Sequence, residues 1–227
     1  MHIEPGIVVG AAKLALGYAT AAGAIGYSAK LAYDMAKKDG VGQTALRTLV
    51  TTALVLFFFE ILPHYPVGVS EVHFILGSTL FLMFGAGPAA IGLACGLLAQ
   101  GIFLAPADLP QYGMNVTTLL VPLLAVNALA ARVIPAGTAY ADVSYAQALK
   151  LSTAYQGGVV AWVGFWAFYG AGFGAENLAN VSAFAGAYLS VIVVEPVLDL
   201  GILAAAKALR SLEATGLFHS RLYRAAA

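Results

Sequence analysis

The first two residues, Met1 and His2, bring together nitrogen donors of the kind that bind transition metals. The free α-amine, the His2 amide nitrogen and the His2 imidazole can close two small chelate rings on one ion, leaving one corner of a square plane open. Nitrogen-rich tetragonal sites suit Ni(II), Cu(II) and related ions. We expect Met1 to be retained, because a bulky second residue generally blocks its removal. A histidine at position two also occurs by chance, so the rest of the chain has to decide between the two interpretations.

A fourth nitrogen can come from another histidine on the same side of the molecule. His64 and His73 both fall in the loop over residues 63–73, whereas His219 lies near the other terminus. Either loop histidine could fill the open corner, and spacing alone does not choose between them.

The composition predicts a polytopic membrane protein. Apolar residues make up 61% of the 227 residues, charged residues 10%, and the mean hydropathy is +0.86, which is far from the composition of soluble domains. A helix needs about 20 apolar residues to cross the hydrocarbon core. We therefore predict an all-α integral membrane protein, a bundle of about seven transmembrane helices that forms a single domain over residues 1–227. The expected spans cover residues 7–29, 45–62, 74–84, 89–104, 116–134, 157–173 and 183–209.

The charges predict the orientation of this bundle. The loops over residues 63–72, 105–115 and 174–182 contain no Lys or Arg, whereas the alternate connections are flanked by Lys30, Lys37, Lys38, Arg47, Arg132, Lys150, Lys207, Arg210, Arg221 and Arg224. The positive-inside rule then predicts that the N-terminus lies outside and that the tail over residues 210–227 is cytoplasmic. Lys13 breaks the pattern, and we expect it to snorkel from the outer end of the first span.

Two other features of the sequence carry structural expectations. Ala19-Thr20-Ala21 resembles a signal-peptide cleavage site, but no basic segment precedes it and Lys13 interrupts the apolar stretch, so we expect no cleavage. The lone Cys95 lies within a span, and we expect it to be a small buried residue.

Glu195 and Asp199 are carboxylates within the last expected span, at positions i and i+4 on one helical face. Such groups are costly in lipid and mark either an ion path or a hydrogen-bonded pair facing the bundle interior. No other span offers a matching chain of acids. We therefore favour the structural interpretation of the pair.

Small residues form a stripe along the first expected span. Ala11, Ala15, Ala19 and Gly23 follow at four-residue spacing, with Ala22, Gly26 and Ala29 on neighbouring faces. Such stripes permit close approach of helices in membranes. The partner helix could belong to this chain or to another protein.

Three motifs in this order resemble the CbiM/NikM family, the substrate-binding S components of cobalt and nickel energy-coupling-factor transporters. They are the start Met1-His2-Ile3 with Gly6, a proline seven positions before a loop histidine (Pro66 and His73, with Gly68 and Ser70 between), and Leu104-Ala105 followed by Gly113-Met114-Asn115-Val116. The resemblance covers roughly the first 135 residues.

The resemblance implies a square-planar site for transported Ni²⁺ or Co²⁺, with no permanent cofactor. Its corners are the Met1 amine, the His2 amide, the His2 imidazole and the His73 imidazole. A ligand imidazole usually donates its other N–H to a nearby acceptor. We rank Asn115 first for that role, with Ser70 and Glu71 as the other candidates.

The resemblance also implies partners in a bacterial inner membrane. These are a coupling protein of the EcfT or CbiQ type and ATPases of the EcfA or CbiO type, with a small CbiN- or NikN-type subunit as a further candidate. No G-x-x-x-x-G-K-[ST] motif occurs, so partners must hydrolyse ATP, and nothing indicates an enzyme or a nucleic-acid role. The alternative is a self-contained secondary transporter or an intramembrane enzyme that uses Glu195 and Asp199.

Overall fold

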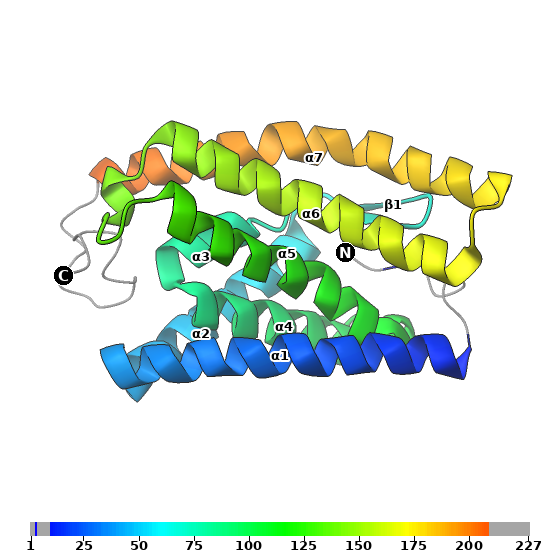
Figure 1. Cartoon of the computed structure of the whole chain (residues 1–227), viewed down its shortest axis with the longest axis horizontal. Coiled ribbons are helices and arrows are strands. Elements are labelled where there is room, and N and C mark those ends of the chain that lie inside the picture. Colours follow the sequence, from blue (N-terminus) through cyan, green and yellow to red (C-terminus); the bar gives the residue numbers. More distant parts are fainter. Residues whose placement is uncertain (1–2, 4–9, 209–227) are drawn as a thin grey trace.

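The apolar segments form helices because a backbone surrounded by lipid must satisfy its polar groups within itself. The computed structural model describes residue 3 and residues 10–208. Within them lie seven α-helices, with a β-hairpin between the second and the third (Figure 1). The helices are α1 (Ala11–Asp39), α2 (Val41–Ile61), α3 (Gly77–Phe84), α4 (Ala86–Phe103), α5 (Tyr112–Val133), α6 (Tyr145–Ala171) and α7 (Ala175–Ala208); two 3₁₀ turns, η1 (Pro106–Gln111) and η2 (Tyr140–Asp142), precede α5 and α6.

Each expected span overlaps one of these helices, so the all-α fold predicted from the sequence is confirmed. In the described part of the chain, four helical segments are long and apolar enough to cross a membrane: Val41–Ile61, Ala86–Phe103, Pro106–Val133 and Ala175–Ala208. The protein is therefore a multi-pass membrane protein.

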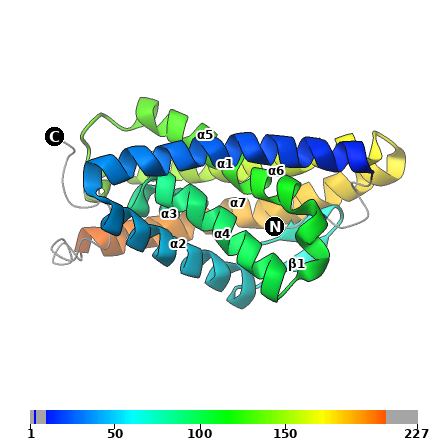
Figure 2. The same ribbon diagram turned by 90° about the horizontal axis from the view of Figure 1, so that it is seen from below.

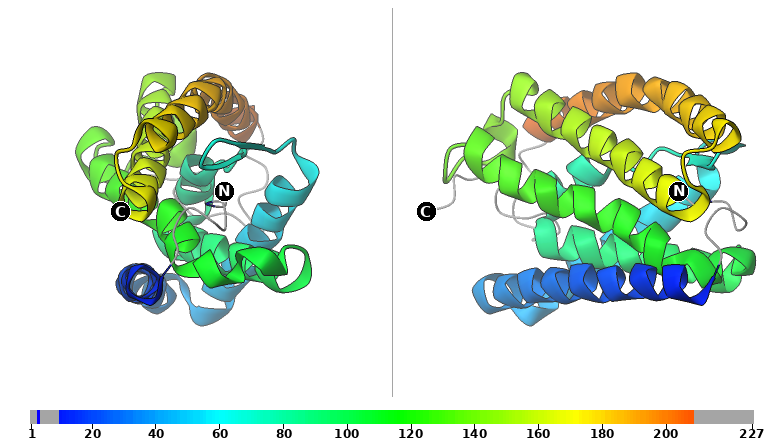
Figure 3. Two further views of the ribbon diagram at one scale, coloured as in Figure 1. Left: turned by 90° about the vertical axis from the view of Figure 1, so that its right-hand side faces the viewer. Right: turned by 45° about the vertical axis from the view of Figure 1, so that its right-hand side comes forward.

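The third expected span departs from the prediction. Helix α3 has only eight residues, which at 1.5 Å per residue rise about 12 Å, well short of a hydrocarbon core of about 30 Å. The chain reaches α3 through the hairpin of β1 (Tyr65–Val67) and β2 (Ser70–Val72). Viewed end on, this hairpin lies between α2 and α7 (Figure 3). The segment over residues 74–84 is thus a broken span, an extended stretch followed by the short helix α3.

The loops that lack basic residues gather at one end of the bundle, as their charge pattern predicts. The hairpin, the turn before α5 and the turn between α6 and α7 lie together at the right-hand end of Figure 1. At this end Lys13 Nζ donates to the carbonyl of Gly170 at 2.5 Å. That carbonyl belongs to the last turn of α6, where a cation complements the helix dipole.

Helix α1 runs along the outside of the bundle, packed on α4 and α5 (Figure 2). Its buried side is made of Gly17, Ala21, Ala24 and Ser28. Contact there is very close: a Cβ added to Gly113 of α5 would lie 2.8 Å from the backbone of Gly17. The stripe that begins at Ala11 is exposed instead, so it does not serve packing within the described chain.

Cys95 is also exposed, on α4, so the expectation that it is buried is wrong. Its neighbours on that surface include Leu98 and Ile102, which are exposed apolar side chains. Cysteine behaves as a small apolar residue, so an outward-facing position on an apolar helix suits it as well as a core position does.

Candidate metal centre

The hairpin is held on α7 by a glycine at its turn. A two-residue loop between β1 and β2 favours glycine with positive φ, and Gly68 has a φ of +62°. A Cβ at this position would lie 2.1 Å from the carbonyl oxygen of Asn180. Only glycine therefore lets the turn lie against the α7 backbone.

Ile3 is seated at the open edge of this hairpin. It forms an antiparallel bridge with Ser70 of β2, and its N–H donates to Oδ1 of Asn115 at 2.9 Å. Its side chain is fully buried with Met114 and Trp166. Residues near the start of the chain, in the hairpin and in α5 thus meet inside the bundle.

His73 follows β2 and points into the protein, with an exposed fraction of only 1%. Its Nε2 lies 2.7 Å from a carboxylate oxygen of Glu71. The ring also packs against Phe59 of α2, with centroids 5.4 Å apart. The carboxylate fixes which ring nitrogen faces which way, and the aromatic ring limits rotation.

His64 lies over His73 as a stacked ring. The two imidazole centroids are 5.2 Å apart and the rings are inclined by only 9°. His64 itself is exposed, and its Nδ1 lies 3.2 Å from the carbonyl of Leu62. Imidazole lone pairs lie in the ring plane, so two stacked parallel rings cannot both direct a nitrogen at one ion. In this arrangement His64 covers the ring of His73.

The structure brings together His73, Glu71, Ser70 and Asn115 of the residues predicted from the sequence. Met1 and His2 lie outside the described residues. Glu71, not Asn115, contacts the His73 ring, whereas Asn115 holds the backbone of Ile3. Across residue 3 and residues 10–208, no group of three or more His, Cys, Asp or Glu side chains is arranged to hold a metal ion.

Ile3 belongs to the starting motif Met1-His2-Ile3, but its role as an anchor could not be read from the sequence. A buried apolar residue next to a chelating dipeptide is an unremarkable pattern. Its importance becomes visible only from the bridge to Ser70 and the bond to Asn115. Ile3 packs against Met114 and Trp166, which are far away in the sequence, and no local motif predicts this contact.

Glu195 and Asp199 face the bundle interior, as the structural interpretation predicts. Both are buried and both contact the start of α3. Glu195 accepts the N–H groups of Ile75 and Leu76, and Asp199 accepts the hydroxyls of Ser78 and Thr79. Carboxylates at the first turn of a helix satisfy donors that the helix itself cannot.

These features define a class: a multi-pass helical membrane protein whose polar residues converge on a buried site at one end of the bundle. The chain belongs to the CbiM family, because the family model described as the cobalt uptake substrate-specific transmembrane region matches residues 2–212. The match runs beyond the first 135 residues and through α7. Neither the comparison with curated proteins nor that with solved structures finds a match. The protein is thus a substrate-specific membrane component for cobalt uptake and belongs to a transport family, not an enzyme family.

Proposed function

We propose that this protein captures Co²⁺ or Ni²⁺ at its outer end and hands the ion to partner subunits for ATP-driven uptake. The ligands are the Met1 amine, the His2 amide nitrogen, the His2 imidazole and the His73 imidazole. The observation that carries this proposal is the seat of Ile3, which ties the start of the chain to the loop that bears His73.

The direction of the Ile3 bridge supports this ligand set. In an antiparallel pair, positions before Ile3 correspond to positions after Ser70, and His73 is three residues after Ser70. Two residues of extended chain cover about 7 Å. We therefore propose that the two residues before Ile3 share one ion with the His73 ring.

The donor chemistry supports a transition ion. With Nε2 of His73 directed at Glu71, Nδ1 is the ring nitrogen that we assign to the metal. A deprotonated amide favours a square plane, which suits Ni²⁺ and low-spin Co²⁺. Mg²⁺ and Ca²⁺ prefer oxygen ligands, and Zn²⁺ prefers a tetrahedron.

The exposed side of α1 supports docking of a transmembrane coupling protein. Gly23 and Gly26 have no neighbouring atoms within 4 Å of an added Cβ, so this side is open to a close helix. No nucleotide-binding motif occurs in the chain, so ATP hydrolysis requires another subunit.

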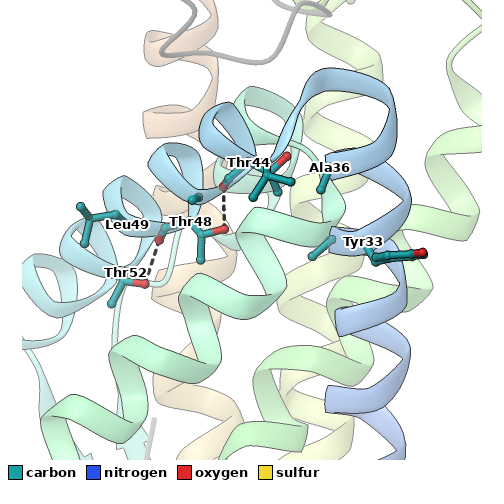
Figure 4. A pocket seen from close by; sticks show the side chains of 9 residues that line it. Tyr33, Ala36, Thr44, Thr48, Leu49 and Thr52 are labelled. Atoms are coloured by element: carbon teal, nitrogen blue, oxygen red, sulfur yellow. Dashed lines mark hydrogen bonds between the residues drawn. The ribbon is translucent and has the colours of Figure 1, made fainter.

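A groove between α1 and α2 extends this surface at the opposite end from the hairpin. It encloses about 480 Å³ and is lined by residues such as Tyr33, Ala36 and Leu49 (Figure 4). The hydroxyls of Thr48 and Thr52 bond to carbonyls one turn earlier in α2, so these side chains can present methyl groups to the groove. We assign the groove to an apolar helix of the coupling protein.

The engaged carboxylates argue against the alternative functions. A relay through Glu195 and Asp199 needs groups that exchange partners, whereas Glu195 bonds to the backbone just before α3 and Asp199 bonds to a hydroxyl within α3. We therefore retain the capture subunit in place of a secondary transporter or an intramembrane enzyme.

Metal content of the purified intact chain tests the ligand set. We expect about one Co²⁺ or Ni²⁺ per chain in the unmodified protein and loss of binding when one residue is inserted between Met1 and His2, because the chelate rings then cannot form. His73→Ala should also abolish binding, whereas the matched variant His64→Ala should retain it. Unchanged binding after the insertion would show that the terminal chelate is wrong.

Association with the coupling protein tests the docking surface separately. Gly23→Leu should reduce copurification with that protein and leave metal binding unchanged. Gly186→Leu is the matched control, because Gly186 of α7 is also exposed with nothing within 4 Å of an added Cβ. Equal copurification of both variants would move the docking surface away from α1.

A further inference from the structure

We propose that Glu195 is a positioning residue for the metal ligand His73, an inference that rests on the proposed function. Its carboxylate fixes the backbone of residues 75 and 76 and thereby the place at which the His73 side chain enters the site. Helix α7 would then belong to the binding machinery, although it contributes no ligand.

The Glu195 carboxylate accepts hydrogen bonds from two consecutive backbone N–H groups. Oε2 accepts from Ile75 at 2.8 Å and Oε1 accepts from Leu76 at 2.9 Å. These donors lie two and three residues after His73. A bidentate contact of this kind fixes direction as well as distance, because both oxygens must stay in line with their donors.

The backbone of Leu76 has a strained conformation that the bond to Glu195 can stabilise. A φ of 53° makes Leu76 the one residue other than glycine with positive φ among the residues that the structure describes. A left-handed conformation is unfavourable for a branched side chain and persists only where the surroundings impose it. The turn at Leu76 is what directs the chain from the extended segment after β2 into α3.

Glu195 is itself held in place. It is fully buried, and Nε2 of Gln156 donates to its Oε1. The amide of Gln156 is oriented by the hydroxyl of Tyr188, which donates to its Oε1 at 2.7 Å. A chain of hydrogen bonds from Tyr188 of α7 through Gln156 of α6 to Glu195 of α7 thus fixes the orientation of the Glu195 carboxylate.

The segment that carries His73 is fixed to α7 at both ends. At its outer end the turn at Gly68 lies against the backbone of Asn180, and at its inner end Glu195 holds Ile75 and Leu76. His73 lies between these two anchors. A change at Glu195 should therefore displace the imidazole without touching it.

Asp199 provides a matched control on the same helix. It lies one turn beyond Glu195 and is also buried, but it accepts side-chain hydroxyls from Ser78 and Thr79 within α3. We expect loss of this contact to affect α3 and to leave the backbone before it unchanged. A comparison of variants at Glu195 and Asp199 therefore distinguishes an effect on the position of His73 from an effect on the stability of the bundle.

The test compares Glu195→Gln with Asp199→Asn in the purified intact protein, using Co²⁺ and Ni²⁺ alone as the ligands. Glutamine retains the size of glutamate but replaces one acceptor with a donor that faces other donors. We expect Glu195→Gln to raise the metal Kd roughly 10- to 100-fold, as loss of a group that orients a ligand does, and Asp199→Asn to change it by less than about threefold.

Two readouts exclude a purely structural effect. The visible d–d absorption of the bound ion should change in Glu195→Gln, because the His73 nitrogen moves relative to the plane, and should remain unchanged in Asp199→Asn. Thermal unfolding should report a similar loss of stability in both. If Glu195→Gln does not fold, Gln156→Leu removes a donor that holds the carboxylate and should weaken metal binding several-fold.

The outcomes separate the two proposals. Failure of the unmodified protein to bind either ion overturns the proposed function. If the unmodified protein binds metal and Glu195→Gln has the same Kd and spectrum, the positioning role of Glu195 is wrong while the ligand set stands. Equal loss of affinity in both variants likewise reduces Glu195 to a structural residue.

Discussion

Asn115→Leu should weaken metal binding while leaving every proposed ligand in place. Asn115 has an exposed fraction of 1% and its Oδ1 accepts the N–H of Ile3, which is fully buried. Leucine has the same branching as asparagine but no acceptor, so the N–H of Ile3 would be buried without that partner. The substitution therefore acts on the seat of the chain start.

The expected magnitude follows from this single bond. A buried donor that loses its partner costs about 1–3 kcal/mol. If the chain start must be seated for the ion to bind, the whole cost falls on binding, and about 1.4 kcal/mol corresponds to a tenfold change. The metal Kd should then rise roughly 5- to 150-fold.

Isothermal titration of the purified protein with Co²⁺ measures this change. Asn127→Leu is the matched control, because Asn127 lies 12 residues further along the same helix and is half-buried, about 18 Å away along the helix axis. We expect the control to bind as the unmodified protein does. If Asn115→Leu binds within about threefold of the unmodified protein while His73→Ala does not bind, the seat of Ile3 is not coupled to the metal and the reasoning from that bond fails.

Three further predictions concern packing, charge and pH. Gly77→Ala should lower the thermal unfolding temperature, because its Cβ would lie 2.3 Å from the buried ring of Tyr155. Overpacking of this kind costs about 1–3 kcal/mol of folding free energy. The control Gly157→Ala should leave the unfolding temperature unchanged, because its Cβ would meet nothing within 4 Å. Asp39→Asn should destabilise the protein because Arg47, 4% exposed, would lose a charged partner 2.5 Å away. Breaking a buried ion pair costs about 3–5 kcal/mol of folding free energy. Metal affinity should not change, because this pair lies at the opposite end of the bundle, and a change in affinity would contradict our assignment of the two ends. Metal affinity should fall as the pH is lowered, because the ligands must be deprotonated, and competition at an α-amine of pKa about 7.8 alone weakens binding about fortyfold between pH 8 and pH 6. A titration that is flat over this range would exclude the amine as a ligand.

The sequence predicted the helices well because apolar length is a local property. It also grouped the loops at the hairpin end correctly, since Lys and Arg are absent from all three. The inward orientation of Glu195 and Asp199 followed from the cost of burying a carboxylate in lipid.

The broken span could not be predicted in the same way. Residues 74–84 are uncharged and mostly apolar, which is the pattern of a short crossing helix. The backbone before Gly77 is not helical, and its N–H groups at Ile75 and Leu76 bond to Glu195, more than 100 residues later in the chain. Hydropathy contains no information about such a distant acceptor.

The contacts of the candidate site could be predicted only in part, for a similar reason. His73 and Glu71 are neighbours along the chain, and their contact is local. The role of Asn115 depends on a bond to a residue 112 positions away, so its side chain holds Ile3 and not the imidazole that the sequence suggested. The exposed stripe on α1 had two open interpretations, and only the packing of Gly17 against Gly113 shows which side of the helix is used within the chain.

The burial of Ile3 has a consequence for the lifetime of the captured ion. An ion whose ligands belong to the chain start can depart only after that start is withdrawn from the protein, which requires breaking a strand bridge and exposing an apolar side chain to water. Under the proposed ligand set, escape of the ion is then slower than its encounter with the protein, and residence time more than collision frequency sets how well the protein scavenges a scarce metal.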